Sequence, residues 1–402
     1  MSAITLAFAI FGIMLVFMAI RVPIAVAMFA AGSIGYVMQT GWGPFSSFLN
    51  TQAFARFASY DLSVIPLFIL MGHFATQGGI SKSLFSFAAG VMGRFKGGLA
   101  TGTLAAGTLA AGGTLGILIP PSVPLVIYAI LTEQNIAKLF AAAMVPGVIA
   151  MLGYMAAIAI YVRLVPGQAP DIDDHRPALT RRSFLGILPI GIIFLLVFGG
   201  IYGGWFTPTE GAAVGAAATF VTTLLRREMT WAKFKLCFYA TAESSAMIFL
   251  IFIGADLMNS ALALTQIPSQ LASVVGNWGL SPLMVVTAIL LFYVVLGAVM
   301  DELSMLLLTI PIFFPMVIGL DFGMPRESVA TWFGIMVLMT VGFGLLAPPV
   351  GLNVYVVNGL AKDVPLSESY KGVMPFLISD TLRTTLLLLF PGISLWLVKY
   401  IA

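Results

Sequence analysis

Two stretches of this chain combine glycines with a proline pair inside strongly apolar surroundings. They are Gly113–Pro124 (GTLGILIPPSVP) and Val341–Leu352 (VGFGLLAPPVGL). Proline removes a backbone donor and blocks the preceding helical turn, so each pair predicts an interrupted helix. The freed carbonyls can replace the water shell of a hard cation such as sodium, and the N-termini of opposing half-helices can attract an anionic group. The two stretches therefore predict a site for ions and an anionic solute.

An acidic position elsewhere could complete this site. Asp301 directly follows an apolar run, and an intramembrane acid costs at least about 2.5–3.5 kcal/mol on insertion scales unless it is compensated. Ser304 lies three residues later and would share its helical face. Among carbonyls and side chains, we expect sodium ligands at Gly113, Thr114, Gly116, Pro120, Asp301, Ser304, Gly344, Ala347 and Pro348. We expect substrate contacts at Pro121, Ser122, Pro349 and Asn353.

Each pattern also has a simpler interpretation. A single Pro-Pro motif is more often a kinked helix without a ligand, and only the repetition favours a site. Asp301 and Glu302 could be ordinary loop acids at an aqueous boundary. Glu210 fits a helix start capped by Thr207 or Thr209.

The composition is that of a multi-pass membrane protein. Of 402 residues, 60% are hydrophobic and 9% charged, against roughly 25% charged in soluble domains. The apolar runs predict about ten membrane helices and additional re-entrant segments. One cysteine, Cys237, excludes an internal disulfide framework, and two histidines without ligand-spaced partners exclude the usual zinc patterns. A net charge of +3 without a basic face argues against nucleic-acid binding.

Basic residues gather in two polar loops, which the positive-inside rule places in the cytoplasm. The first loop contains Arg163, Arg176, Arg181 and Arg182, and the second contains Arg226, Arg227, Lys233 and Lys235. The apolar stretch between them should therefore cross the membrane as a hairpin that turns near Gly203–Trp205. Glu243 and Asp256, in later apolar segments, could be polar contacts between helices or part of a transport path.

The chain also contains an internal repeat. The Pro-Pro pairs lie 228 residues apart, and in this frame Gly116 matches Gly344 and Pro121 matches Pro349. We predict a first repeat at residues 1–165, a cytoplasmic linker at 166–182 and a second repeat at 183–402. Repeats of this kind underlie alternating access in transporters.

The two repeats differ in length. Gly79–Leu84 resembles Gln266–Leu271 at an offset of only 187, so the first repeat is shorter by 41 residues before its Pro-Pro pair. At this place the second repeat contains Gly297–Pro315, an apolar run that could enter and leave the membrane on one side. The first repeat therefore lacks, after Ala100, a hairpin of about 40 residues.

Four motifs resemble the large membrane subunit of TRAP (tripartite ATP-independent periplasmic) transporters, the DctM-like family. They are Gly113–Tyr128, Leu346–Val357, Met300–Met305 and Trp205–Glu210. The resemblance implies an all-α protein of two inverted repeats, each with a re-entrant hairpin and a broken helix. It implies elevator-type, sodium-coupled import of an organic acid, such as a dicarboxylate or a sialic-acid-like carboxylate, across the bacterial inner membrane. The implied partners are a small four-helix membrane subunit and a periplasmic substrate-binding protein, with no organic cofactor.

The chain departs from this family pattern after Phe95–Ala100, where the family continues into a first hairpin with a Gly-Ser-Ser tip. Here the chain passes directly to Thr101–Leu104, and Ala347 stands where many members have Thr. Because loss of a hairpin should expose unpaired backbone, we expect the natural subunit to contain the additional residues. An intact mass near 42.7 kDa for the purified subunit would contradict this expectation.

Other classes of function remain open at this stage. A stand-alone ion-coupled permease of the same superfamily would need no binding protein. A non-transporting membrane scaffold would tolerate alanine at all four prolines of the two pairs. An intramembrane enzyme would need a nucleophile beside a base, and Cys237 has no histidine near it in the sequence. We therefore expect a transporter and no enzyme.

Overall fold

The computed structural model describes residues 3–80, 103–165, 181–266, 279–360 and 365–401. Helices account for all regular structure in this part of the chain, as expected. Those of the first half are α1 (Ala3–Ala19), α2 (Ile24–Thr40), α3 (Trp42–Phe57), η1 (Asp61–Ser63), α4 (Val64–Gln77), α6 (Thr103–Leu118), α7 (Val123–Thr132) and α8 (Ile136–Leu164). Those of the second half are α9 (Arg181–Tyr202), α10 (Pro208–Leu225), α11 (Trp231–Leu264), α13 (Pro282–Gly297), α14 (Glu302–Ile318), α15 (Arg326–Gly344), α16 (Leu352–Leu360), α17 (Leu366–Leu389), α18 (Gly392–Leu395) and η2 (Leu397–Tyr400).

Many of these helices suit a membrane by length and composition. Five apolar segments of at least 18 residues can span a bilayer: Ala106–Thr132, which includes the first Pro-Pro pair, Ile136–Leu164, Trp231–Leu264, Arg326–Gly344 and Leu366–Leu389. Five shorter apolar helices, including α13 and α14, accompany them in the described residues. At 1.5 Å per residue, α13 is about 24 Å long, less than the roughly 30 Å of a hydrocarbon core.

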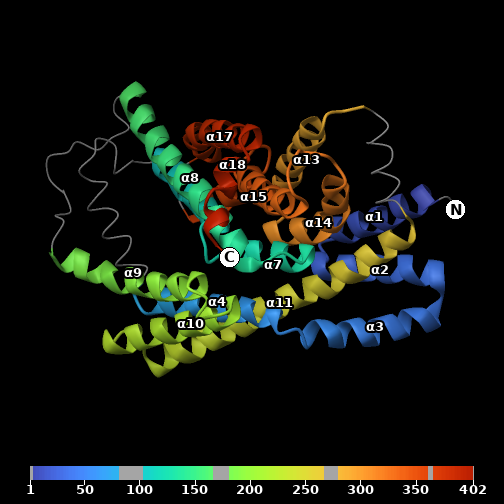
Figure 1. Cartoon of the computed structure of the whole chain (residues 1–402), viewed down its shortest axis with the longest axis horizontal. Helices are drawn as coiled ribbons and strands as arrows, with labels where there is room; N and C mark the ends of the chain where they lie inside the picture. Colours follow the sequence, from blue (N-terminus) through green and yellow to red (C-terminus); the bar gives the residue numbers. More distant parts are fainter. Residues whose placement is uncertain (1–2, 81–102, 166–180, 267–278, 361–364, 402) are drawn as a thin grey trace.

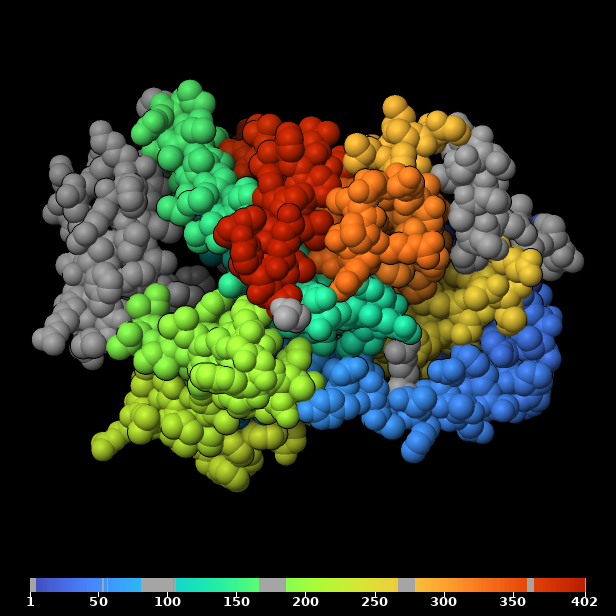
Figure 2. All heavy atoms as spheres, viewed as in Figure 1, coloured from blue at the N-terminus to red at the C-terminus, as the bar shows by residue number. Residues whose placement is uncertain are grey.

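The helices form two groups. In the first, α11 packs along α2 and α4, while α4 packs on α10 (Figure 1). In the second, α15 packs against α6, α8, α13, α14 and α17. The two groups meet where α14 contacts α11 and α7 contacts α4. Figure 2 shows the teal segment that contains α7 between the orange and red helices and the blue helices.

The first group depends on close contact between helix backbones. A Cβ at Gly32 of α2 would lie 2.6 Å from the Met258 backbone nitrogen of α11. A Cβ at Gly254 of α11 would lie 2.5 Å from the Ala25 carbonyl oxygen. Glycine is the residue that allows such an approach, which gains dispersion energy where lipid supplies no hydrophobic driving force.

The stretch between the two basic loops forms a helical hairpin, as predicted, and its crossing of the membrane stays a prediction. α9 and α10 pack together and are joined at residues 203–207, the predicted turn. The start of α10 is a capping box, in which Thr207 Oγ1 accepts from the Glu210 amide at 3.2 Å. Glu210 Oε2 accepts in return from the Thr207 amide at 2.8 Å. Thr207 is therefore the cap, and Glu210 has the structural role expected.

Substitution of Gly32 by Ala should destabilise the protein, because the added methyl group meets backbone atoms of α11 that cannot rotate away. We expect a loss of about 1–3 kcal/mol, seen as a lower melting temperature in detergent. Gly72→Ala is the matched control, since a Cβ at that position would meet no atom within 4 Å. Equal melting temperatures for the two variants would contradict the tight α2–α11 contact.

Candidate functional site at the broken helices

The first Pro-Pro pair interrupts a helix, as predicted. α6 ends at Leu118 and α7 begins at Val123, with a cis peptide bond between Pro120 and Pro121. Ser122 bridges the interruption, since its hydroxyl donates to the Ile117 carbonyl and accepts from the Leu125 amide. This residue is buried, and both functions of its hydroxyl are used within the break. The structure therefore places Ser122 as the N-cap of α7.

The second pair interrupts the chain in the same way. α15 ends at Gly344 and α16 begins at Leu352, with a cis bond between Pro348 and Pro349. The backbone N–H of Asn353 donates across the gap to the Leu345 carbonyl at 3.2 Å. The Tyr370 hydroxyl donates to the Pro349 carbonyl at 3.0 Å, so α17 also supports this break.

A pocket of about 610 Å³ lies between elements of the two breaks. α6 supplies Leu109, Ala110, Gly113, Gly116 and Ile117, and the start of α14 supplies Asp301, Glu302 and Leu303. The end of α15 and the start of α16 supply Leu345, Leu352, Asn353, Val356 and Val357. The side-chain Nδ2 of Asn353 would be 3.4 Å from a Cβ added at Gly113, so the two broken segments face each other directly.

Helix ends of both polarities line this pocket. The N-termini of α14 and α16 contribute Glu302 and Leu352, and partial positive charge at such termini attracts anions. The C-terminal ends of α6 and α15 contribute Ile117 and Leu345. The Ile117 carbonyl accepts from the Ser122 hydroxyl and the Leu345 carbonyl from the Asn353 backbone N–H, and each oxygen keeps a second lone pair that suits a cation. The pocket can therefore accept an anion and a cation side by side.

The two acids are the charged groups of the pocket lining. Asp301 is the N-cap of α14 and is exposed, and its Oδ2 accepts from the Ser304 amide at 3.0 Å. Glu302 follows as the first helical residue and is partly buried. Two adjacent carboxylates in the lining of a largely apolar pocket favour a cation there. The sequence interpretation considered Glu302 only as a loop acid, so its place in the lining is new.

The structure brings four predicted site residues into the pocket lining: Gly113, Gly116, Asp301 and Asn353. The other predicted residues, which are Thr114, Pro120, Pro121, Ser122, Ser304, Gly344, Ala347, Pro348 and Pro349, do not line it. Ser304 does not share a helical face with Asp301, because Asp301 precedes the helix as its cap. The Ser304 hydroxyl is buried without a hydrogen-bond partner in the described residues. Gly344 instead packs on Gly297, where a Cβ added to Gly344 would lie 2.8 Å from the Gly297 Cα.

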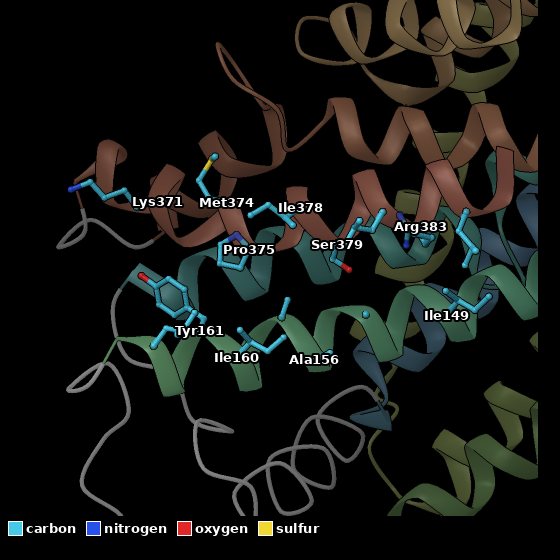
Figure 3. Close-up of a pocket in the computed structure, with 15 residues that line it drawn as sticks. Ile149, Ala156, Ile160, Tyr161, Lys371, Met374, Pro375, Ile378, Ser379 and Arg383 are labelled. Carbon is cyan, nitrogen blue, oxygen red and sulfur yellow. The ribbon is translucent and has the colours of Figure 1, made fainter. Parts of the chain in front are cut away.

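Two other cavities have different character. A groove of about 570 Å³ between α8 and α17 is lined mainly by aliphatic side chains, with Tyr161 and Lys371 at one end (Figure 3). Its apolar walls offer little to a small organic anion. A cavity of about 370 Å³ at the contact of α3, α11 and α14 is lined by Gln52, Asp256, Asn259 and Ser260, among others. Asp256 thus lines a cavity between the two helix groups, whereas Glu243 is exposed.

The fold has a counterpart among solved structures. The crystal structure of the Alcanivorax borkumensis YdaH transporter, described as having an unusual topology, matches with a TM-score of 0.55. The match covers 96% of this chain and 99% of that chain at 14% sequence identity. It supports the all-α membrane transporter fold.

Two relatives match along most of the sequence. The C4-dicarboxylate TRAP transporter large permease protein DctM of Pseudomonas aeruginosa is 31% identical over 395 positions, covering 88% of this chain and 90% of that protein. The sialic acid TRAP transporter large permease protein SiaM of Vibrio cholerae is 27% identical, covering 87% and 89%. Since 88% of 402 residues is about 354, about 41 of the 395 positions of the first alignment have no residue of this chain.

The family model of the DctM component of tripartite ATP-independent periplasmic transporters matches residues 11–107 and 101–393. The two matched segments meet at 101–107, next to Ala100, where the repeat comparison predicts missing residues. The predicted hairpin position, after Ala100, lies within residues 81–102, which are outside the described part of the chain. The family matches on both sides of this position, and the relatives are named as permeases rather than enzymes. The chain belongs to the DctM family of TRAP transporter large permease subunits.

Proposed function

We propose that this permease imports an organic acid across the bacterial inner membrane with sodium as the coupling ion. The observation that carries this proposal is the pocket between the two broken helices, where two acids and the ends of four helices meet. Its volume of about 610 Å³ suits a small organic acid with accompanying ions. The relatives named for C4-dicarboxylates and sialic acid give the range of carboxylates to test.

Sodium and the substrate carboxylate would bind to different groups of the pocket. Sodium prefers oxygen ligands, which Asp301, Glu302 and the carbonyls at the ends of α6 and α15 can supply. The substrate carboxylate would lie at the N-terminus of α16, where Asn353 offers a side-chain amide donor. Bound sodium would offset the repulsion between the two acids and the substrate anion. This mutual dependence is the physical basis of coupling.

The tripartite family also implies partners and a movement. The proposed partners are a small four-helix membrane subunit and a periplasmic protein that delivers the substrate. The proposed movement is an elevator-type displacement of the second helix group against the first. The contacts of α14 with α11 and of α7 with α4 would then be the sliding surfaces.

Sodium should stabilise the purified subunit against heat, because a ligand that binds only the folded state raises its melting temperature. Sodium chloride should raise the melting temperature more than choline chloride at equal concentration. Asp301→Asn should weaken the sodium response about tenfold in half-saturating concentration, equivalent to about 1.4 kcal/mol. Asparagine caps a helix as well as aspartate does, so this change removes charge and keeps the cap. Glu243→Gln, an exposed acid on α11, is the control.

An unchanged sodium response in both Asp301→Asn and Glu302→Gln would contradict the ion site. Identical melting curves in sodium and choline for the unmodified subunit would contradict sodium coupling itself.

Gly113→Val should abolish uptake of the carboxylate by proteoliposomes that contain the complete transporter. The added side chain would enter the pocket against the Asn353 amide, at a distance of 3.4 Å for its first carbon alone. Gly112→Val is the matched control, because a Cβ at Gly112 would meet no atom within 4 Å. Both variants replace glycine by valine within α6, so they change helix propensity equally. Equal uptake by both would show that the pocket does not hold the substrate.

A further inference from the structure

A network of buried polar groups connects α17, α8 and α6 outside the pocket lining, and it ends on Thr114, one of the residues expected from the sequence to bind sodium. The Arg383 guanidinium contacts Asp380 Oδ1 at 2.8 Å, and both side chains are buried. Asp380 Oδ2 accepts from the Tyr154 hydroxyl at 2.9 Å. The Tyr154 hydroxyl is in turn 3.2 Å from Thr114 Oγ1. Neither Asp380 nor Tyr154 lines the candidate pocket.

The donor and acceptor properties of these groups fix the direction of the hydrogen bond between Tyr154 and Asp380. A carboxylate can only accept, so the single Tyr154 proton goes to Asp380. The Tyr154 oxygen then acts as an acceptor toward Thr114. The single Thr114 proton can go to the Tyr154 oxygen at 3.2 Å or to the Ala111 carbonyl at 2.8 Å, so these two acceptors compete for it. By accepting the Tyr154 proton, Asp380 leaves the Tyr154 oxygen as an acceptor for Thr114, which links α17 to α6 through α8.

Thr114 lies on a face of α6 beside the one that lines the pocket. Its Cβ would be 3.3 Å from a Cβ at Gly342 of α15, and its hydroxyl faces α8, whereas Gly113 and Gly116 line the pocket. Successive residues of a helix are about 100° apart, so a small rotation of α6 would turn Gly113 away from Asn353. The Thr114 contact opposes this rotation.

Burial of the Asp380–Arg383 ion pair costs free energy of desolvation, so a structural role alone is a weak reason for it. Two buried charges are costly to desolvate, and an apolar pair of similar volume is often as stable. Elsewhere α6 and α17 already meet closely, since a Cβ at Gly107 would lie 2.2 Å from the Gly372 carbonyl. Stability alone therefore does not explain Asp380 and Arg383. Arg383 also lies in the wall of the α8–α17 groove (Figure 3).

We propose that Asp380, acting through Tyr154, is a positioning residue that sets the rotation of α6 and so presents Gly113 and Gly116 to the pocket. The part of this inference that concerns sodium rests on the proposed function. The rotation of α6 does not, and it can be measured separately.

The first test is Tyr154→Phe, which removes the hydroxyl and keeps the ring that packs edge-on against Phe376 at 5.2 Å. The half-saturating sodium concentration should rise about threefold to tenfold, with an unchanged maximal response. Thr114→Val should raise the half-saturating sodium concentration by the same factor. Thr114→Ser, which keeps the hydroxyl, should leave it at the value of the unmodified subunit. Tyr161→Phe on the same helix is the control, because the Tyr161 hydroxyl does not belong to the hydrogen-bond network of Asp380, Tyr154 and Thr114.

The second test uses Asp380→Leu with Arg383→Leu. Removing both charges avoids an unpaired buried charge, so folded protein should be recovered at the normal level. Tyr154 then has no carboxylate acceptor, and the sodium shift of Tyr154→Phe should reappear. A normal sodium response in this folded double variant would overturn the inference.

The third test does not depend on sodium. Cys237→Ser removes the only natural cysteine, and Gly113→Cys with Asn353→Cys then reports the contact of α6 with α16 by disulfide formation. Tyr154→Phe in this background should slow cross-linking at least about threefold, whereas Tyr161→Phe should not. Equal cross-linking rates would overturn the positioning role. A subunit with no sodium response but slowed cross-linking would contradict the proposed function alone.

Discussion

Backbone polar groups in an apolar environment must find partners, and the architecture of this permease depends on that requirement. Each Pro-Pro pair stops a helix within an apolar stretch of the chain, which leaves carbonyl and amide groups without intrahelical partners. The first break satisfies some of them through Ser122, and the second through Asn353 and Tyr370. The ends of α6, α14, α15 and α16 meet at one pocket, so the breaks that need these partners also shape the candidate site.

Packing around the breaks is correspondingly rigid. α15 is buried along almost its whole length, and the Trp332 indole nitrogen donates to the Leu387 carbonyl of α17 at 3.0 Å. From the other side, the Tyr128 hydroxyl of α7 donates to the Ala330 carbonyl at 2.7 Å. Gly334 leaves room for the Tyr128 ring. The two broken helices are thus held to each other by contacts away from the pocket, and the site is supported from behind.

Much of this organisation could be predicted from residue types. Proline chemistry located both breaks, hydrophobic runs located the membrane helices, and the Thr-Pro-Thr-Glu motif located a helix start. The direction in which each side chain points could not be predicted, because it depends on tertiary packing. Thr114 and Ser304 were expected among the ligands, yet neither is in the pocket lining, and the Thr114 hydroxyl instead lies 3.2 Å from that of Tyr154. Asp301 was expected on a helical face but caps the helix instead.

The network behind the pocket was missed although its signal was present. Asp380 and Arg383 stand three residues apart within the apolar segment Leu366–Leu389, a spacing that pairs charges on a helix. Their partner Tyr154 is 226 positions away from Asp380, and no local pattern connects the two. The difference in length between the repeats stays a prediction, since its position lies within residues 81–102, outside the described part.

The two breaks also differ in when they can be completed during synthesis. Ser122 bonds to Ile117 and Leu125, so all partners of the first break lie within a few residues and exist as soon as that segment leaves the ribosome. The second break needs Tyr370, which is translated about 20 residues later. The first half can therefore enter the membrane with its break already satisfied and await its partner. The hydrogen bonds of the second break are complete only after α17, which carries Tyr370, has been synthesised. The binding pocket is therefore among the last features of the molecule to form.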